Sequence, residues 1–173
     1  MSITTRIIDH GYNAMLKAHK SVYTKVGFPE NGTIGTGVET VVGKYGSKRK
    51  MVTVPVETMS EIATIAAVHE FGAPNKNIPE RSFLRTTLDE HYGDLQSFKV
   101  RQYQLFLQGS FGLKEAIGRV GEWLVGKVQA RIRSGPFQVL SPATLAAKFP
   151  KTKPLIDTGQ LLNSLQHEEY IQL

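Results

Sequence analysis

His69 and Glu70 are neighbouring side chains that together could bind a metal ion or transfer a proton. A metalloprotease helix needs a second His four residues after the first, because residues at i and i+4 share one helix face. Position 73 is Ala73, and the other histidines stand singly in the sequence: His10, His19, His91 and His167. The pattern favours a histidine at the edge of the core that fixes a turn by hydrogen bonding, and we expect no metal site.

The other reactive residues also lack the spacing of a catalytic centre. Asp89 and Glu90 are adjacent on a predicted helix and therefore point to different faces, and Glu168-Glu169 lie near the end of the sequence. No Ser lies in a Gly-x-Ser-x-Gly turn, and no helix start follows the glycine-rich residues 32–37 to hold a phosphate. The absence of cysteine excludes a thiolate nucleophile. We therefore expect no catalytic residue, no cofactor and no enzymatic activity.

Positive charge is concentrated in one segment, residues 44–50. The chain has 21 Lys and Arg against 15 Asp and Glu, a formal net charge of +6. Four cations and no acid fall within this segment: Lys44, Lys48, Arg49 and Lys50. They could contact nucleic-acid phosphates without sequence preference, and such binding would weaken as salt rises. A solvated loop, or one that meets an acidic patch on another protein, is the alternative.

Glu80, Arg81 and Arg85 flank the start of a predicted helix. Glu80 suits the positive N-terminal end of that helix. Arg81 and Arg85 are four residues apart and would share a face, where they could grip carboxylates on a neighbouring subunit. Ordinary surface charge explains the pair equally well, and both interpretations stay open.

The strand signals lie mainly in the N-terminal half of a chain that we expect to be one domain, residues 1–173. β-Branched residues bounded by Gly, Asn or Pro predict three strands: 21–28, 36–43 and 51–56. The basic segment would then be a loop at a hairpin tip, and residues 169–173 could add a strand. No apolar run approaches the ~20 residues that span a bilayer. We predict an α+β fold in which a small antiparallel sheet packs against two long helices.

Apolar residues at spacings of three and four predict the helices. They cover residues 4–20, 60–70, 83–107, 113–134 and 143–149. We expect Ser60 to cap the second helix and Gly93 to weaken the third, and Ser141-Pro142 is a favourable start for the last. Gly118 and Gly121 cost about 1 kcal/mol each relative to Ala inside a helix. The sequence therefore indicates close approach of another helix or of a neighbouring subunit at these glycines.

Two segments have the composition of fixed corners. In the first, Gly72 ends a helix and Pro74 prevents its continuation, before Ile78-Pro79 turns the chain into the next helix. In the second, Asp157 and Gln160 have the spacing of a capping box that would begin a short helix over residues 159–164. Both corners set the angle between packed elements.

Four segments in order resemble one known family. They are His69-Glu70-Phe71-Gly72, Ile78-Pro79-Glu80-Arg81-Ser82-Phe83-Leu84-Arg85, Leu140 to Lys148 (Leu-Ser-Pro-x-Thr-x-x-x-Lys), and Pro154 to Ser164, which contains Asp157-Thr158-Gly159. This series resembles the small tail-completion and neck (head–tail joining) proteins of tailed bacteriophages, which are related to the phage virion-morphogenesis proteins. The resemblance spans residues 60–165, and the four motifs in order are more specific than any one alone.

The resemblance implies a structural virion protein, made in the cytoplasm of a bacterial host, that forms a ring at the head–tail junction. The ring would be a homo-oligomer, a hexamer or a dodecamer, in contact with the head connector and with tail terminator or tail tube proteins. Cyclic rings need heterologous interfaces, and the candidate interface residues are Glu80, Arg81, Arg85, Gly118 and Gly121. Lys44, Lys48, Arg49 and Lys50 could face packaged DNA or a partner. The alternative is a sequence-independent nucleic-acid-binding module acting through residues 44–50.

Overall fold

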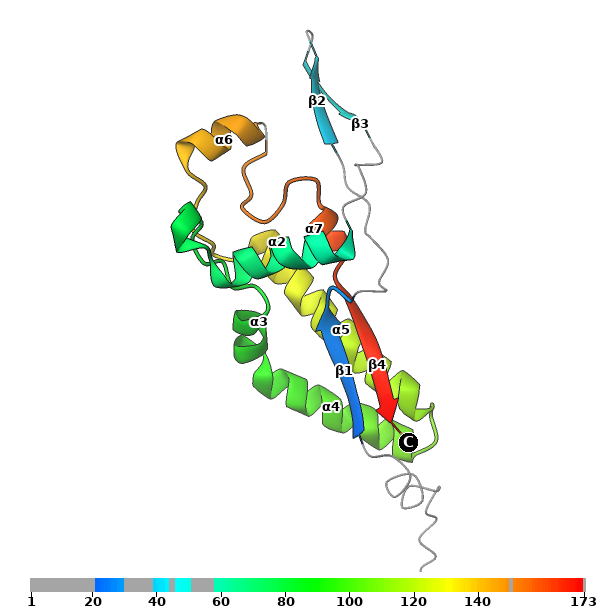
Figure 1. Ribbon diagram of the computed structural model, residues 1–173. Coiled ribbons are helices and arrows are strands. Elements are labelled where there is room, and N and C mark those ends of the chain that lie inside the picture. Colours follow the sequence, from blue (N-terminus) through cyan, green and yellow to red (C-terminus); the bar gives the residue numbers. More distant parts are fainter. Residues whose placement is uncertain (1–20, 30–38, 44–45, 51–57, 150, 173) are drawn as a thin grey trace, which may run out of the picture.

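The computed structural model describes residues 21–29, 39–43, 46–50, 58–149 and 151–172 (Figure 1). Their fold is α+β, as predicted. The strands are β1 (Ser21–Gly27), β2 (Glu39–Gly43), β3 (Gly46–Lys50) and β4 (Gln166–Gln172). The helices are α2 (Met59–Phe71), the short 3-10 helix η1 (Pro74–Lys76), α3 (Arg85–Glu90), α4 (Tyr92–Leu107), α5 (Leu113–Ser134), α6 (Pro142–Lys148) and α7 (Gln160–Asn163). The predicted helix 4–20 and strand 51–56 lie outside the described residues.

A two-stranded antiparallel ribbon brings the first and last described elements together. β1 pairs with β4 from Ser21↔Gln172 to Gly27↔Gln166. The expected C-terminal strand therefore forms, and it is the partner of β1. Across the ribbon, the rings of Tyr23 and Tyr170 stack with their centroids 5.0 Å apart. Such cross-strand aromatic pairs stabilise a sheet that has only two strands.

The hairpin of β2 and β3 corrects the prediction of a basic loop at residues 44–50. Lys48, Arg49 and Lys50 lie within β3 and pair with β2. Gly43 pairs with Gly46, so the connection is residues 44 and 45, and Lys44 lies outside the described residues. A strand of Lys, Arg and Ser lacks the β-branched residues that normally indicate one. Its pairing with β2 was therefore not visible in its own composition.

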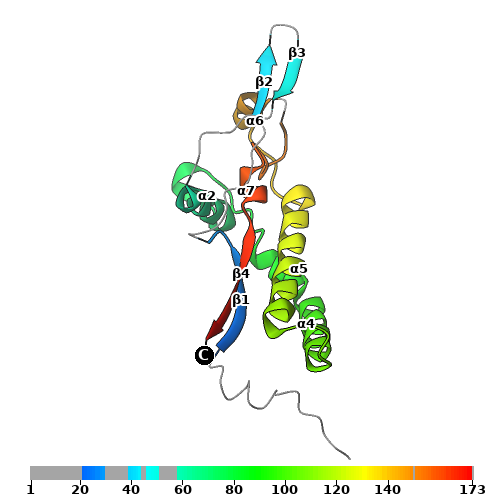
Figure 2. The same ribbon diagram turned by 90° about the vertical axis from the view of Figure 1, so that its right-hand side faces the viewer.

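Helix α5 lies between the β1–β4 ribbon and helix α4 (Figure 2). It has the predicted bounds, because its apolar stripe recurs at helical spacing along its whole length. The predicted helix 83–107 is divided at His91 into α3 and α4, two residues before Gly93. Thr58, and not Ser60, caps α2, because its side chain accepts from the backbone N–H of Glu61 in a capping box. None of the helices in the described parts of the chain is both long enough and apolar enough to cross a bilayer.

The close neighbour of Gly118 and Gly121 is the ribbon of the same chain, which corrects the expectation of another helix or a subunit. A Cβ at Gly118 would lie 2.8 Å from Oε1 of Glu169. A Cβ at Gly121 would lie 2.6 Å from the ring of His167 and 2.7 Å from Oγ1 of Thr24. Both glycines are buried and let β1 and β4 approach the backbone of α5.

The buried hydrophobic cluster joins the two corner segments. Its members come from α2, the start of α3, the C-terminal half of α5 and the region around α7: Ala66, Phe83, Val128, Ile132, Leu155, Leu162 and Leu165. Phe83 is wholly buried, and burial of a Phe side chain stabilises a fold by about 1.5–3 kcal/mol. The segments 68–85 and 154–164 therefore depend on each other through this core.

Candidate functional site

The Glu70 carboxylate lies buried at the N-terminal end of α3. It belongs to the inward face of α2, which also carries Ile62 and Ala66, and its exposed fraction is 3%. Its oxygens accept hydrogen bonds from the backbone N–H groups of Phe83 (2.8 Å), Leu84 (2.9 Å) and Arg85 (3.0 Å), and from Oγ of Ser82 (2.7 Å). The first N–H groups of a helix have no partner within it and favour a negative charge. Glu70 therefore caps α3 from a distant turn of the chain.

Arg85 holds the same carboxylate from the solvent side. Its Nε donates to Oε1 of Glu70 at 3.1 Å, and its Nη2 donates to the backbone oxygen of Glu70 at 3.1 Å. Nη2 also donates to Oε1 of the exposed Glu80 at 2.7 Å, and the guanidinium lies 4.7 Å from the ring centroid of Phe71. Glu80 is thus an ion-pair partner of Arg85, while the place expected for it at the helix start belongs to Glu70.

The hydrogen bonds at this site decide the charge of Glu70. Burial alone would raise the pKa of the carboxyl group. The bonds from Leu84, Arg85, Ser82 and Phe83 outweigh burial, and the pKa lies below its usual value. The carboxylate is therefore ionised at neutral pH, and both of its oxygens accept hydrogen bonds.

Gly72 shapes the corner between α2 and the chain that returns to Glu70. Its φ of 73° and ψ of 170° belong to a region that is open essentially to glycine alone. A Cβ there would also lie 2.9 Å from the backbone nitrogen of Glu80. The returning chain is fixed by the backbone hydrogen bond from Arg81 N to His69 O at 2.7 Å. The expected corner at Gly72 and Pro79 is therefore present, with its partners identified.

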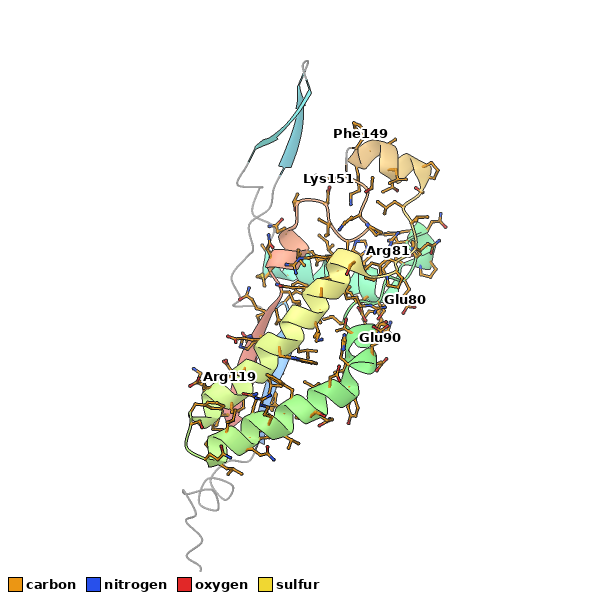
Figure 3. The ribbon with its side chains drawn as sticks, turned by 180° about the vertical axis from the view of Figure 1, so that it is seen from behind. Glu80, Arg81, Glu90, Arg119, Phe149 and Lys151 are labelled. Carbon is orange, nitrogen blue, oxygen red and sulfur yellow. The ribbon has the colours of Figure 1, made fainter. Side chains whose placement is uncertain are left out.

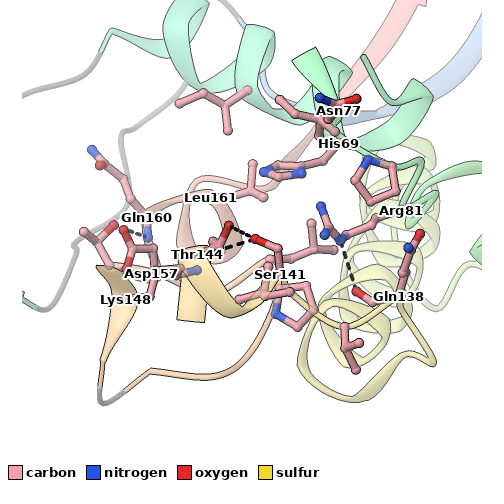
Figure 4. A pocket seen from close by; sticks show the side chains of 18 of the residues that line it. His69, Asn77, Arg81, Gln138, Ser141, Thr144, Lys148, Asp157, Gln160 and Leu161 are labelled. Atoms are coloured by element: carbon pink, nitrogen blue, oxygen red, sulfur yellow. Dashed lines mark hydrogen bonds between the residues drawn. The ribbon is translucent and has the colours of Figure 1, made fainter. Parts of the chain in front are cut away.

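A pocket of about 710 Å³ lies beside this corner (Figure 4). Its walls come from all four segments on which the family resemblance rests, through His69, residues 78–81, residues 140–148 and residues 154–161. Most of the lining is apolar, with Ile62 and Leu155 among the wall residues. Segments that are far apart in the sequence thus meet around one cavity.

Arg81 points into this pocket and not towards the outside, which corrects the expectation that it shares a surface with Arg85 (Figures 3 and 4). The reason is that α3 begins at Arg85, so Arg81 precedes the helix and follows a different path. Its exposed fraction is 6%. Its Nε donates to the backbone oxygen of Gln138 at a long 3.4 Å, and burial lowers the pKa of the guanidinium.

Two further basic groups line the pocket. Nδ1 of His69 is buried without a hydrogen-bond partner, so the side chain does not fix the turn as expected. Burial lowers the pKa of His69, and the nearby charges of Arg81 and Lys148 lower it further. Nζ of Lys148 donates to the backbone oxygens of Lys153 and Ile156, both at 3.3 Å. At neutral pH, the imidazole is therefore uncharged beside two cations.

Asp157 does not cap α7, which corrects the capping-box assignment. Its side chain is 64% exposed and pairs with Nζ of Lys151 at 3.4 Å. Gly159 occupies the N-cap with a φ of 86°, and Oγ1 of Thr158 accepts from the backbone N–H of Gln160 at 3.2 Å. Because the left-handed glycine starts the helix at Gln160, Asp157 lies outside it.

Across the parts of the chain that the structure describes, no three His, Cys, Asp or Glu side chains gather in a way that could hold a metal ion. No family model, curated protein or solved structure matches this chain. Any functional proposal must therefore rest on the sequence motifs, the pocket and the surfaces of the chain itself.

Helix α4 has an exposed apolar stripe that the sequence analysis missed. The stripe consists of Tyr92, Val100, Tyr103 and Leu107, with exposed fractions of 58%, 55%, 36% and 38%. These positions fall within one face of a helix, because their spacings of eight, three and four residues approximate whole turns. An adjoining face of α4, with Leu95 and Gln102 buried, packs towards α5. A second apolar periodicity within one helix was the signal in the sequence.

Proposed function

We propose that this chain is a structural virion protein of a tailed phage, which forms a homo-oligomeric ring at the head–tail junction and joins the tail to the DNA-filled head. The resemblance of the four ordered segments supports the virion setting. The observation that carries the assembly role is the exposed apolar stripe of α4, Tyr92, Val100, Tyr103 and Leu107.

The stripe is suited to assembly because its apolar area is gathered on one helix face. Single exposed apolar residues are common on soluble proteins, whereas contiguous patches mark interaction sites. In a closed ring each protomer presents one surface to a different surface on the next. We propose that the stripe is one of these two surfaces, in place of Arg81, Gly118 and Gly121, which are buried within the chain.

A structural role also agrees with how the reactive side chains are used. Glu70 is fully occupied in capping α3, and Arg85 is bonded to Glu70 and Glu80. These groups hold the corner between α2 and α3 in one geometry. A subunit that must fit a ring benefits from such a fixed corner.

The test compares oligomer size and virion assembly. The double change Val100→Lys and Leu107→Lys places two charges on the stripe, and we expect light scattering to find monomers where the unchanged chain forms a ring. The control, Asp94→Lys, also raises the net charge by two, at an exposed position on the side of α4 turned away from the stripe, and should leave the ring intact. Circular dichroism should give the same helix content for all three proteins.

Two results would contradict the proposal. One is an unchanged chain that remains a monomer at all concentrations. The other is a phage that lacks this gene and still produces complete, tailed particles by electron microscopy.

The alternative function, sequence-independent nucleic-acid binding, rests on the β2–β3 hairpin. Three consecutive cations, Lys48, Arg49 and Lys50, lie in its second strand. Among the described elements, the hairpin strands contact chiefly each other (Figure 1). Such contacts would be to phosphates and would not read base sequence.

A further inference from the structure

We propose that the pocket around Arg81 binds a carboxylate presented by a short apolar segment of another protein. This inference rests on the pocket alone and does not depend on the ring. The ligand would be an Asp or Glu side chain flanked by apolar residues. It would bring its carboxylate to Arg81 and its neighbours to the apolar walls.

The first support is the state of the Arg81 guanidinium. The Arg81 residue has an exposed fraction of 6%, and among the described residues its guanidinium makes one hydrogen bond, from Nε to the backbone oxygen of Gln138. Among the described residues no carboxylate forms an ion pair with it, although Arg85, four residues later, has two such partners. A buried charge normally has a partner, because removal from water is costly. The Nη groups are free to donate to a carboxylate, which an Arg binds through paired N–H groups.

The second support is the balance of charge around the pocket. Arg81 and Lys148 are cations, and the acid in the lining, Asp157, is exposed and paired with Lys151. The imidazole of His69 contributes a buried nitrogen, Nδ1, that has no hydrogen-bond partner among the described residues. The charges around the cavity therefore favour an anion.

The third support is the size and lining of the cavity, which fit a peptide better than a nucleic acid. A volume of about 710 Å³ is that of a site for several side chains and not for a single ion. Ile62, Ile78 and Leu161 are among the apolar walls. A carboxylate stands at the tip of a slender side chain and can reach a buried Arg, whereas each phosphodiester group continues into nucleotides on both sides.

The test uses two matched peptides with the full chain. The probes are Ac-Leu-Glu-Leu-NH2 and Ac-Leu-Gln-Leu-NH2, and their binding is measured by saturation-transfer difference NMR. We expect at least tenfold stronger binding of the Glu peptide. Arg81→Met should reduce it to the level of the Gln peptide, while Arg81→Lys should retain part of the preference. Arg119→Met removes an exposed arginine towards the far end of α5 and should change nothing (Figure 3).

The thermal midpoint separates this role from a purely structural one. Because Arg81 has no internal ion-pair partner, Arg81→Met should unfold at or above the temperature of the unchanged chain. Equal binding of the two peptides, no binding of either at millimolar concentration, or a clear drop in the midpoint for Arg81→Met would overturn the proposal. A DNA oligonucleotide whose binding depends on Arg81, with the peptides indifferent to that change, would overturn it too and make the pocket a phosphate site.

Discussion

At the scale of single residues, Glu70 is the side chain on which most of the corner depends. Glu70→Gln replaces one acceptor oxygen by an NH2 group that faces donors, and it removes the negative charge from the start of α3. We expect a loss of about 2–4 kcal/mol in the free energy of unfolding, since buried donors lose their partner. Urea denaturation followed by circular dichroism measures this change.

Glu80→Gln is the matched control for Glu70→Gln, because both acids bind the same Arg85. The Glu80 side chain is 56% exposed and accepts from no backbone N–H of α3. An exposed ion pair of this kind contributes about 0–1 kcal/mol. Equal losses in the two variants would show that the ion pair, and not the helix cap, gives Glu70 its importance.

His69 gives a prediction for pH dependence. The folded chain lowers the pKa of His69 through burial and the charges of Arg81 and Lys148. The unfolded chain takes up this proton near the ordinary pKa of about 6.5, and the folded chain does so only at lower pH. Stability should therefore fall as pH drops below about 6.5, with a slope of at most ~1.4 kcal/mol per pH unit from this group.

The pH prediction is checked with His69→Gln by urea denaturation at pH 7.5 and 5.5. The variant should lose less stability between these two values than the unchanged chain. Glu70 does not interfere, because its lowered pKa places its own loss of stability below the ordinary carboxyl range of about 4.5. Parallel losses in the two proteins would show that His69 titrates alike in the folded and unfolded chains.

At the scale of elements, replacing two glycines of α5 by Ala distinguishes the effect of helix propensity from the effect of packing. Gly121→Ala places a Cβ 2.6 Å from the His167 ring and 2.7 Å from Thr24 Oγ1, so the ribbon must move. We expect a loss of about 1–3 kcal/mol from this overpacking. Gly126→Ala meets nothing within 4 Å and should gain about 0.5–1 kcal/mol, as Ala favours the helix. Thermal denaturation compares them, and a stabilised Gly121→Ala protein would show that the ribbon yields easily.

The helices and strands also show which features of the fold could be predicted from the sequence. The bounds of α5 and the existence of β1 and β4 were predictable, because their signals are local periodicities. The pairing of β1 with β4 was not predictable, since no residue pattern states which distant strand will be the partner. The cap on α3 was hidden for the same reason. Its acceptor, Glu70, is 13 to 15 residues from the donors of Phe83, Leu84 and Arg85, whereas local capping patterns span three.

The sequence predicted which residues form the candidate site, but not how their side chains are arranged. Patterns of sequence directed attention to His69, Glu70, Arg81 and Arg85, and all four belong to the corner and its pocket. The roles of Arg81 and Arg85 differ from expectation because the direction of the backbone changes between them. Arg81 precedes α3 and turns into the pocket, while Arg85 begins α3 and turns to Glu70. Four-residue spacing implies a shared face only where both residues lie in one helix.

At the scale of the whole molecule, the β2–β3 hairpin should decide whether the chain binds DNA. Replacing Lys48, Arg49 and Lys50 together by Ser removes three consecutive cations from β3. If these residues meet phosphates, the affinity for random-sequence DNA should fall at least tenfold and the dependence of binding on salt should become less steep. Fluorescence anisotropy across a range of salt concentrations measures both quantities.

A variant with the same net charge is needed, because a chain of formal net charge +6 attracts DNA wherever its cations lie. Replacing Arg101, Lys114 and Arg133 by Ser removes three exposed cations from α4 and α5 and leaves the hairpin unchanged. If this control weakens DNA binding as much as the hairpin variant does, the attraction is a property of total charge. If only the hairpin variant loses binding, and the oligomer stays intact, the hairpin is the DNA contact and α4 carries assembly separately.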